Sequence, residues 1–114
     1  MPRANSSVPR HRRHRKIVKL AKGYYGRRKS NFRAAKDAVE KGLQYSYRDR
    51  RNKKRTMRSL WIIRINAAVR QHGLSYSKFI NLLKEKNIDI NRKSLAYMAV
   101  NDPDGFSAII KSIS

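Results

Sequence analysis

The chain has 114 residues, with 29 lysine and arginine residues against seven aspartate and glutamate residues, and a formal net charge of +22 at pH 7. This is the length of one ordinary domain, and the absence of cysteine excludes disulfides and thiolate metal sites. No apolar run approaches the ~18 residues of a membrane span, and no apolar stretch typical of a secretory signal follows the basic N-terminus. Because a globule with this charge would repel itself, composition favours an intracellular protein with a polyanionic partner.

The charge is concentrated in the first half of the chain. Residues 1–58 hold 21 Lys+Arg and three Asp+Glu, a net charge of +18, whereas residues 59–114 hold eight and four, a net charge of +4. Residues 1–30 have too little apolar surface to offset the conformational entropy lost on folding, so we expect them to be disordered in the free protein. We therefore predict two domains: residues 1–58, a basic tail and long helix, and residues 59–114, a helical globular domain.

The periodicity of the chain is helical throughout, which predicts an all-α protein. We expect a small C-terminal helical bundle, from which a long basic helix and an extended N-terminal basic tail project. Residues 11–22 can form a short helix that Gly23 ends. Residues 31–71 contain no proline and predict one long helix. Gly42 costs this helix about 1 kcal/mol relative to alanine and would permit a bend, so the sequence leaves the continuity of the helix open at this point.

Two parts of the long helix carry apolar patterns. An apolar stripe with helical spacing is formed by Phe32, Val39, Leu43 and Tyr47. Further along, residues 59–69 (SLWIIRINAAV) are apolar on most sides, and we expect them to be buried. Gly73 then serves as the stop signal.

Three shorter helices are predicted after the long one. The first begins at a Ser75 or Ser77 cap and stops near Asn87; the second begins at an Asn91 cap; the third has Asp102 as its cap and proline in its first turn. Their apolar faces predict a shared core that also receives two isoleucines from a connector. The expected core residues are Tyr76, Phe79, Ile80, Leu83, Ile88, Ile90, Leu95, Met98, Ala99, Phe106, Ile109, Ile110 and Ile113.

Catalytic chemistry is poorly supported by this sequence. Only seven carboxylates are present, and Asp102 and Asp104 are explained by a helix start, where they complement the macrodipole. His11 and His14 have a spacing that can ligate metal, but the five cations between residues 10 and 16 would repel one. We therefore predict no enzyme, no catalytic residue, no cofactor and no metal.

A dense run of cations lies in the middle of the long helix. Its members are Arg48, Arg50, Arg51, Lys53, Lys54, Arg55 and Arg58. At ~100° per residue they point to nearly every side of the helix, which suits a rod embedded between several phosphate backbones better than a helix lying on one duplex. The alternative is a solvated basic helix, which like charges at i, i+4 would destabilise.

Tyr24 and Tyr25 stand between two glycines in a strongly basic stretch, AKGYYGRRKS. The rings can stack on unpaired bases, while Gly23 and Gly26 let the backbone approach phosphates closely. The other interpretation is that both rings pack on the helix of their own chain. An extended basic tail with aromatic residues favours irregularly folded RNA over a DNA groove, which would need one defined recognition helix.

The segment KRTMRSLWIIRINAAVR, residues 54–70, resembles the signature of a bacterial large-subunit ribosomal protein, the family numbered twenty. The resemblance continues almost from end to end, through residues 8–39, YSYRDRRNKKR, GLSYSKFI, NRKSLAYMA and DPDGFSAII, in the usual order. Two departures are Ile63, where the family more often has a small or polar residue, and Gly42, where alanine is commoner.

This resemblance implies a cytoplasmic protein of the large ribosomal subunit that binds 23S rRNA directly, is needed early in assembly and is not part of the peptidyl-transfer machinery. It also implies contact with neighbouring ribosomal proteins of that subunit, and some members repress their own mRNA through the C-terminal domain. The RNA-binding residues implied for this chain are Arg10, Arg12, Arg13, Arg15, Lys16, Lys19, Lys22, Tyr24, Tyr25, Arg27, Arg28, Lys29, Arg33, Lys36, Arg48, Arg50, Arg51, Lys53, Lys54, Arg55, Arg58, Arg64, Arg92 and Lys93.

Two other classes compete with this interpretation. A DNA-compacting, histone-like architectural protein would explain the charge by arginines in minor grooves, but neither the tyrosine pair nor cations on all sides. A cationic peptide acting on anionic membranes would need a clean apolar face opposite the charge, and residues 31–58 show only a narrow stripe. We therefore expect neither DNA nor a membrane as the partner.

Overall fold

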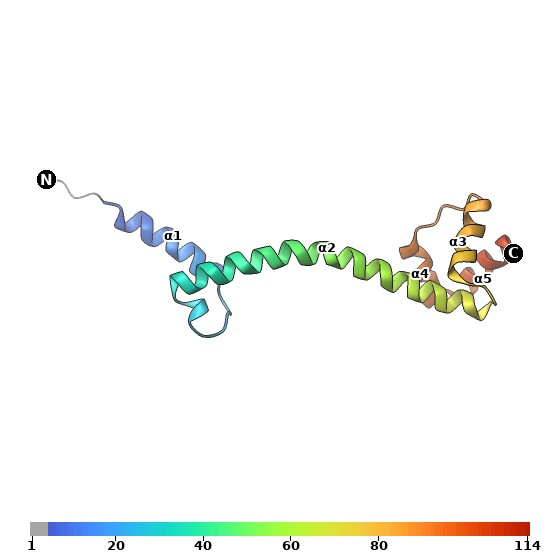
Figure 1. Ribbon diagram of the computed structural model, residues 1–114, viewed down its shortest axis with the longest axis horizontal. Helices are drawn as coiled ribbons and strands as arrows, with labels where there is room; N and C mark the ends of the chain where they lie inside the picture. Colours follow the sequence, from blue (N-terminus) through green and yellow to red (C-terminus); the bar gives the residue numbers. More distant parts are fainter. Residues whose placement is uncertain (1–4) are drawn as a thin grey trace. The chain divides into compact units, whose positions relative to one another are not determined.

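The computed structural model describes residues 5–114, and within them it confirms the predicted all-α class. These residues fold into α1 (Ser7–Leu20), the 3-10 turn η1 (Gly26–Lys29), α2 (Phe32–Gln71), α3 (Tyr76–Glu85), α4 (Arg92–Asn101) and α5 (Pro103–Ile113) (Figure 1). Two compact units share this chain, and the boundary between them falls inside α2, between Arg51 and Asn52. The predicted domain boundary at residues 58 and 59 stays a prediction about independent folding.

Helix α2 is continuous through Gly42, so the possible bend at this glycine does not interrupt its 40 residues. The apolar stripe predicted along its first half is only partly correct. Val39 is buried, but Leu43 is 64 % exposed and Tyr47 is 58 % exposed. The reason is that α1 and the loop after it pack against Ala35 and Val39 near the start of α2 (Figure 1). Leu43 and Tyr47 are not part of this contact.

The N-terminal segment is not the extended tail that its composition predicted, because residues 7–20 form the helix α1. The short helix predicted over residues 11–22 is confirmed over most of its length. The last turn of α1 brings Ile17 and Val18 against a small core made by Ala21 with Ala35 and Val39 of α2. Composition predicted disorder because the segment has few apolar residues. Those few lie on adjacent turns of one helix, however, and α2 supplies the opposite side of their contact.

The second unit has the larger core, in which α3, α4 and α5 gather around the last turns of α2 (Figure 1). Ile65 and Val69 of α2 are fully buried, and the rings of Phe79 and Phe106 lie 5.7 Å apart between centroids. The other buried members are Leu83, Leu95, Ala96, Ile110 and Ile113. The connector isoleucines Ile88 and Ile90 pack against this core, as the sequence predicted. Burial of this apolar surface is the main force that stabilises the unit.

Local signals in the second unit are confirmed at nearly every helix limit. The Ser75 side chain accepts a hydrogen bond from the backbone of Lys78, Asn91 accepts one from Ser94, and Asp102 accepts one from Gly105. At the other ends, Gly73 has φ +76° and Asn87 has φ +54°, the left-handed conformation that terminates helices.

The expectation that residues 59–69 are buried is only partly correct, because the apolar residues Leu60, Ile63 and Ala67 of this segment are exposed. Ile63 is 64 % exposed, although Ile65 and Val69 are fully buried. Helices α3, α4 and α5 pack around the last turns of α2, and Ile63 is not part of the core that they form with it. Among the described residues, none of the helices is both long enough and apolar enough to cross a membrane.

Candidate nucleic-acid interface

The first unit carries a basic hollow beside the loop between α1 and α2. The hollow has a volume of about 330 Å³, and its cationic lining consists of Arg15, Lys19, Lys22 and Lys29. Its described lining includes no carboxylate. Gly23 lies at its edge with φ +88°, a conformation that lets the chain turn back so that Lys29 faces the α1 cations. Four positive charges around one concavity form a site for a phosphate group.

The tyrosine pair of the loop is divided between two environments. Tyr24 is half-buried and packs on the small core of Ala21, Ala35 and Val39. Its hydroxyl reaches α2 so closely that a β-carbon placed on Gly42 would lie 2.8 Å from it. Tyr25 points the other way and is 95 % exposed. Tyr24 thus packs on its own chain, as the second interpretation of the pair had it, whereas Tyr25 exposes its ring. Stacking on bases stays a prediction for both rings.

The predicted RNA-binding cations of the first unit are all exposed. They are Arg10, Arg12, Arg13, Arg15, Lys16 and Lys19 on α1, Lys22, Arg27, Arg28 and Lys29 in the loop, and Arg33, Lys36, Arg48, Arg50 and Arg51 on α2. Residues 5–114 contain only two ion pairs, Lys36 with Glu40 at 3.9 Å and Arg48 with Asp49 at 2.9 Å. The hydrogen bond to Asp49 and the charge of its carboxylate raise the pKa of Arg48 above its ordinary value. Nearly all of the positive charge is thus left for an external partner.

Aromatic and hydroxyl side chains on α2 hold several of these arginines in place. The Arg48 guanidinium lies 4.5 Å from the ring centroid of Tyr45, and the Lys41 ammonium lies 5.1 Å from the same centroid. Arg51 lies 5.3 Å from the centroid of the Tyr47 ring and donates a hydrogen bond to its hydroxyl at 3.2 Å. The sequence prediction did not include Tyr45 or Lys41. The signal that could have found them is the spacing of three or four residues between tyrosine and cation on a helix.

The histidines of α1 show no metal-site arrangement. The His14 ring stacks on Phe32, with 3.7 Å between ring centroids and 12° between ring planes. Within residues 5–114, no group of three or more histidine, cysteine, aspartate or glutamate side chains could hold a metal ion. His14 thus helps to join α1 to the first turn of α2.

The second unit places its predicted cations in two settings. Lys53, Lys54, Arg55, Arg58, Arg64 and Lys93 are exposed. Arg92 is half-buried, and its Nε donates a hydrogen bond to the Tyr76 hydroxyl at 2.8 Å, which ties α4 to α3. Arg92 was predicted to contact RNA, but its guanidinium already has a structural partner within the unit. Arg64 and Lys93 line a groove between α2 and α4.

Comparison with known proteins agrees with this picture of a helical chain covered by unpaired cations. The family model described as ribosomal protein L20 matches residues 3–109. The chain belongs to the ribosomal protein L20 family. The chain is 57 % identical over 111 residues to the large ribosomal subunit protein bL20 of Methylorubrum extorquens (strain PA1), covering 97 % of this chain and 92 % of the relative. It is 61 % identical over 111 residues to the protein of the same name from Rickettsia felis (strain ATCC VR-1525 / URRWXCal2), covering 97 % and 95 %.

Proposed function

We propose that this protein is a structural constituent of the large ribosomal subunit, where it binds 23S rRNA directly and promotes early assembly. Its relatives are named as large ribosomal subunit proteins. The observation that carries the proposal is the surplus of exposed cations, because residues 5–114 contain only two ion pairs. The proposed partners are 23S rRNA and neighbouring ribosomal proteins, the proposed location is the cytoplasm, and the proposed role involves no catalysis.

The chemistry of the exposed side chains supports contact with the RNA backbone. Arginine presents a planar fork that binds phosphate oxygens in pairs, and lysine presents a point charge. Each neutralised phosphate releases condensed counterions, which makes binding favourable at low salt and weaker as salt rises. The basic hollow at Arg15, Lys19, Lys22 and Lys29 would receive one phosphate, and Tyr25 beside it would stack on an unstacked base.

The role in early assembly follows from the directions of the cations on α2. Since α2 is helical through residues 48–58, the side chains of this segment surround the helix and are exposed. Such a surface makes its best contacts when several RNA backbones enclose it. Entry after the RNA has closed would require many phosphate contacts and RNA tertiary pairs to break together, so the protein should bind before the RNA closes.

The order of binding tests this proposal. Large subunits are assembled in two reactions: labelled protein is present from the start in one, and in the other it is added only after the particles have been assembled without it. We expect efficient incorporation that survives a high-salt wash only when the protein is present from the start. Equally fast and tight incorporation into completed particles would contradict the enclosed binding mode. Competition among folded rRNA, duplex DNA and anionic vesicles in a filter-binding assay separates the ribosomal function from the DNA-compacting and membrane alternatives.

We also propose that the second unit can repress translation of the protein's own mRNA. The support is that this unit has its own core and its own exposed cations, so it could recognise an RNA element without the first unit. Expression of a reporter fused to the protein's own leader sequence, with and without excess protein, tests this role. Unchanged reporter expression would remove it and leave the ribosomal role intact.

A further inference from the structure

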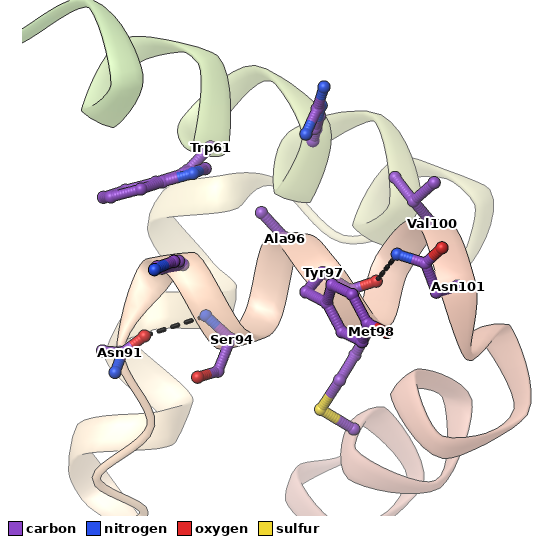
Figure 2. A pocket seen from close by; sticks show the side chains of 10 residues that line it. Trp61, Asn91, Ser94, Ala96, Tyr97, Met98, Val100 and Asn101 are labelled. Atoms are coloured by element: carbon purple, nitrogen blue, oxygen red, sulfur yellow. Dashed lines mark hydrogen bonds between the residues drawn. The ribbon is translucent and has the colours of Figure 1, made fainter. Parts of the chain in front are cut away.

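The second unit contains a groove that its own core does not explain. It lies between α2 and α4, has a volume of about 740 Å³, and is lined by Trp61, Arg64, Asn91, Lys93, Ser94, Ala96, Tyr97, Met98, Val100 and Asn101. In Figure 2, Trp61 projects from α2 at one end of the groove, above the beginning of α4, and Tyr97 stands forward from the middle of α4. The buried Ala96 lies between the two helices, where its small side chain leaves room.

Two large side chains of the groove, one aromatic and one aliphatic, are exposed. Tyr97 is 66 % exposed, and Val100 on the next turn of α4 is also exposed. Exposed aromatic side chains on a concave surface are typical of binding sites rather than of protein cores. Trp61 differs from Tyr97, because it is half-buried and packs against the core of the unit. The groove thus has one aromatic ring held by the core, Trp61, which forms its wall, and one exposed ring, Tyr97, that is accessible to a ligand.

The charge of the groove indicates the kind of ligand it takes. Arg64 and Lys93 are exposed and positive, and aspartate and glutamate are missing from its described lining. The side chains of Asn91 and Asn101 already form hydrogen bonds with the backbone of α4. Asn91, the N-cap, accepts one from the Ser94 N–H, and Asn101 donates one to the Tyr97 carbonyl. The groove combines two cations, Arg64 and Lys93, with the aromatic rings of Trp61 and Tyr97. An acidic peptide would contact only the cations, and an apolar peptide only the rings. A nucleotide uses both, because it joins a flat base to a phosphate.

We propose that this groove binds one unstacked nucleotide of the RNA, with its base on the Tyr97 ring beside the Trp61 wall and its phosphate on Lys93 and Arg64. The proposal rests on the proposed function for the identity of the polymer, and it adds a base-binding position apart from the basic hollow and from the cation run of residues 48–58. Stacking on Tyr97 would let the second unit distinguish a bulge or junction from a regular duplex, which charge alone cannot do.

The experiment uses the full chain and its single tryptophan, Trp61, whose fluorescence reports on the groove and on the core next to it. Two RNA duplexes with the same base pairs are titrated, one fully paired and one with a single bulged adenosine, which adds one phosphate. We expect the bulged duplex to quench Trp61 emission and to bind roughly 5- to 100-fold more tightly, the range that one base–aromatic stack supplies. Tyr97→Ala should remove this preference, and Tyr97→Phe should keep it.

A matched charge pair completes the design. Lys93→Gln should weaken binding of the bulged duplex more than Lys84→Gln, which removes an exposed lysine of α3 outside the groove. Circular dichroism checks that the Tyr97→Ala protein keeps its helices. Equal affinity for both duplexes, or a preference that survives Tyr97→Ala, would overturn the groove proposal and leave the proposed function standing. Failure to bind either RNA would overturn the proposed function and the groove proposal with it.

Discussion

The two units of this protein are both helical, but different forces hold them together. The core of the first unit consists of three buried residues, Ala21, Ala35 and Val39, beneath a dense layer of cations. The core of the second unit has nine buried residues, among them Phe79 and Phe106. Buried apolar area largely sets stability, so the second unit can be stable alone, whereas the first gains most from a partner that neutralises its charge. The comparison teaches that helix content by itself does not indicate which part of a ribosomal protein is stable without RNA.

The largest effect is expected from separating the predicted domains. A fragment of residues 59–114 should be helical and should melt cooperatively, because it contains the core of the second unit. A fragment of residues 1–58 should lose most of its helix, because its core is too small to offset repulsion among its cations. Circular dichroism of both fragments measures this, and addition of RNA should restore helix in the first. A fragment 1–58 that is fully helical and resists protease without RNA would contradict the expectation that the first unit depends on its partner for stability.

The next largest effect is expected from a substitution in the core of the second unit. Phe106→Ala removes a buried ring, and we expect a loss of about 3–5 kcal/mol in the free energy of unfolding. For a small domain this equals much of the total stability. Urea unfolding followed by circular dichroism gives the value. Val100→Ala is the control, since Val100 is exposed and its loss should cost well under 1 kcal/mol. Similar losses for the two variants would show that the second unit does not depend on this core.

Neutralising cations in the middle of α2 tests how strongly this segment contributes to the salt dependence of rRNA binding. Replacing Arg50, Arg51, Lys54 and Arg55 by glutamine should reduce the slope of log affinity for rRNA against log salt by roughly 3, at about 0.7–0.9 per lost phosphate contact. The matched control replaces the four exposed lysines Lys78, Lys84, Lys86 and Lys111. Both variants lose four charges, so net charge alone predicts equal changes. Filter binding at several salt concentrations distinguishes the two, and an unchanged slope for the first set would remove the enclosed helix model.

The smallest effect concerns the neighbouring tyrosines of the loop. Tyr25→Ala should weaken rRNA binding by about 1–3 kcal/mol through loss of one base stack, with helix content unchanged. Tyr24→Ala should instead lower the thermal stability of the first unit, because it empties the space between the small core and Gly42. Affinity and melting temperature measured on both variants separate the two roles. The same loss of affinity with unchanged melting for both would mean that Tyr24 also contacts RNA.

Helix limits, fold class and family could be predicted from the sequence because the signals are local or continuous along the chain. Asn91 and Asp102 cap helices through atoms three residues away, and Gly73 ends α2 through its own φ angle. The excess of positive charge is a property of composition, and it predicted the polyanionic partner before any contact was known.

The remaining features depend on which segments meet in space, and no local pattern contains that information. The sequence assigned the same role to Tyr24 and Tyr25, and only the return of the loop onto Gly42 separates a packing ring from a free one. The groove at Trp61 and Tyr97 likewise exists because α4 crosses α2 at the small side chain of Ala96. Burial is decided by the partner surface, so periodicity can place a residue on a face of a helix but cannot say whether that face is covered.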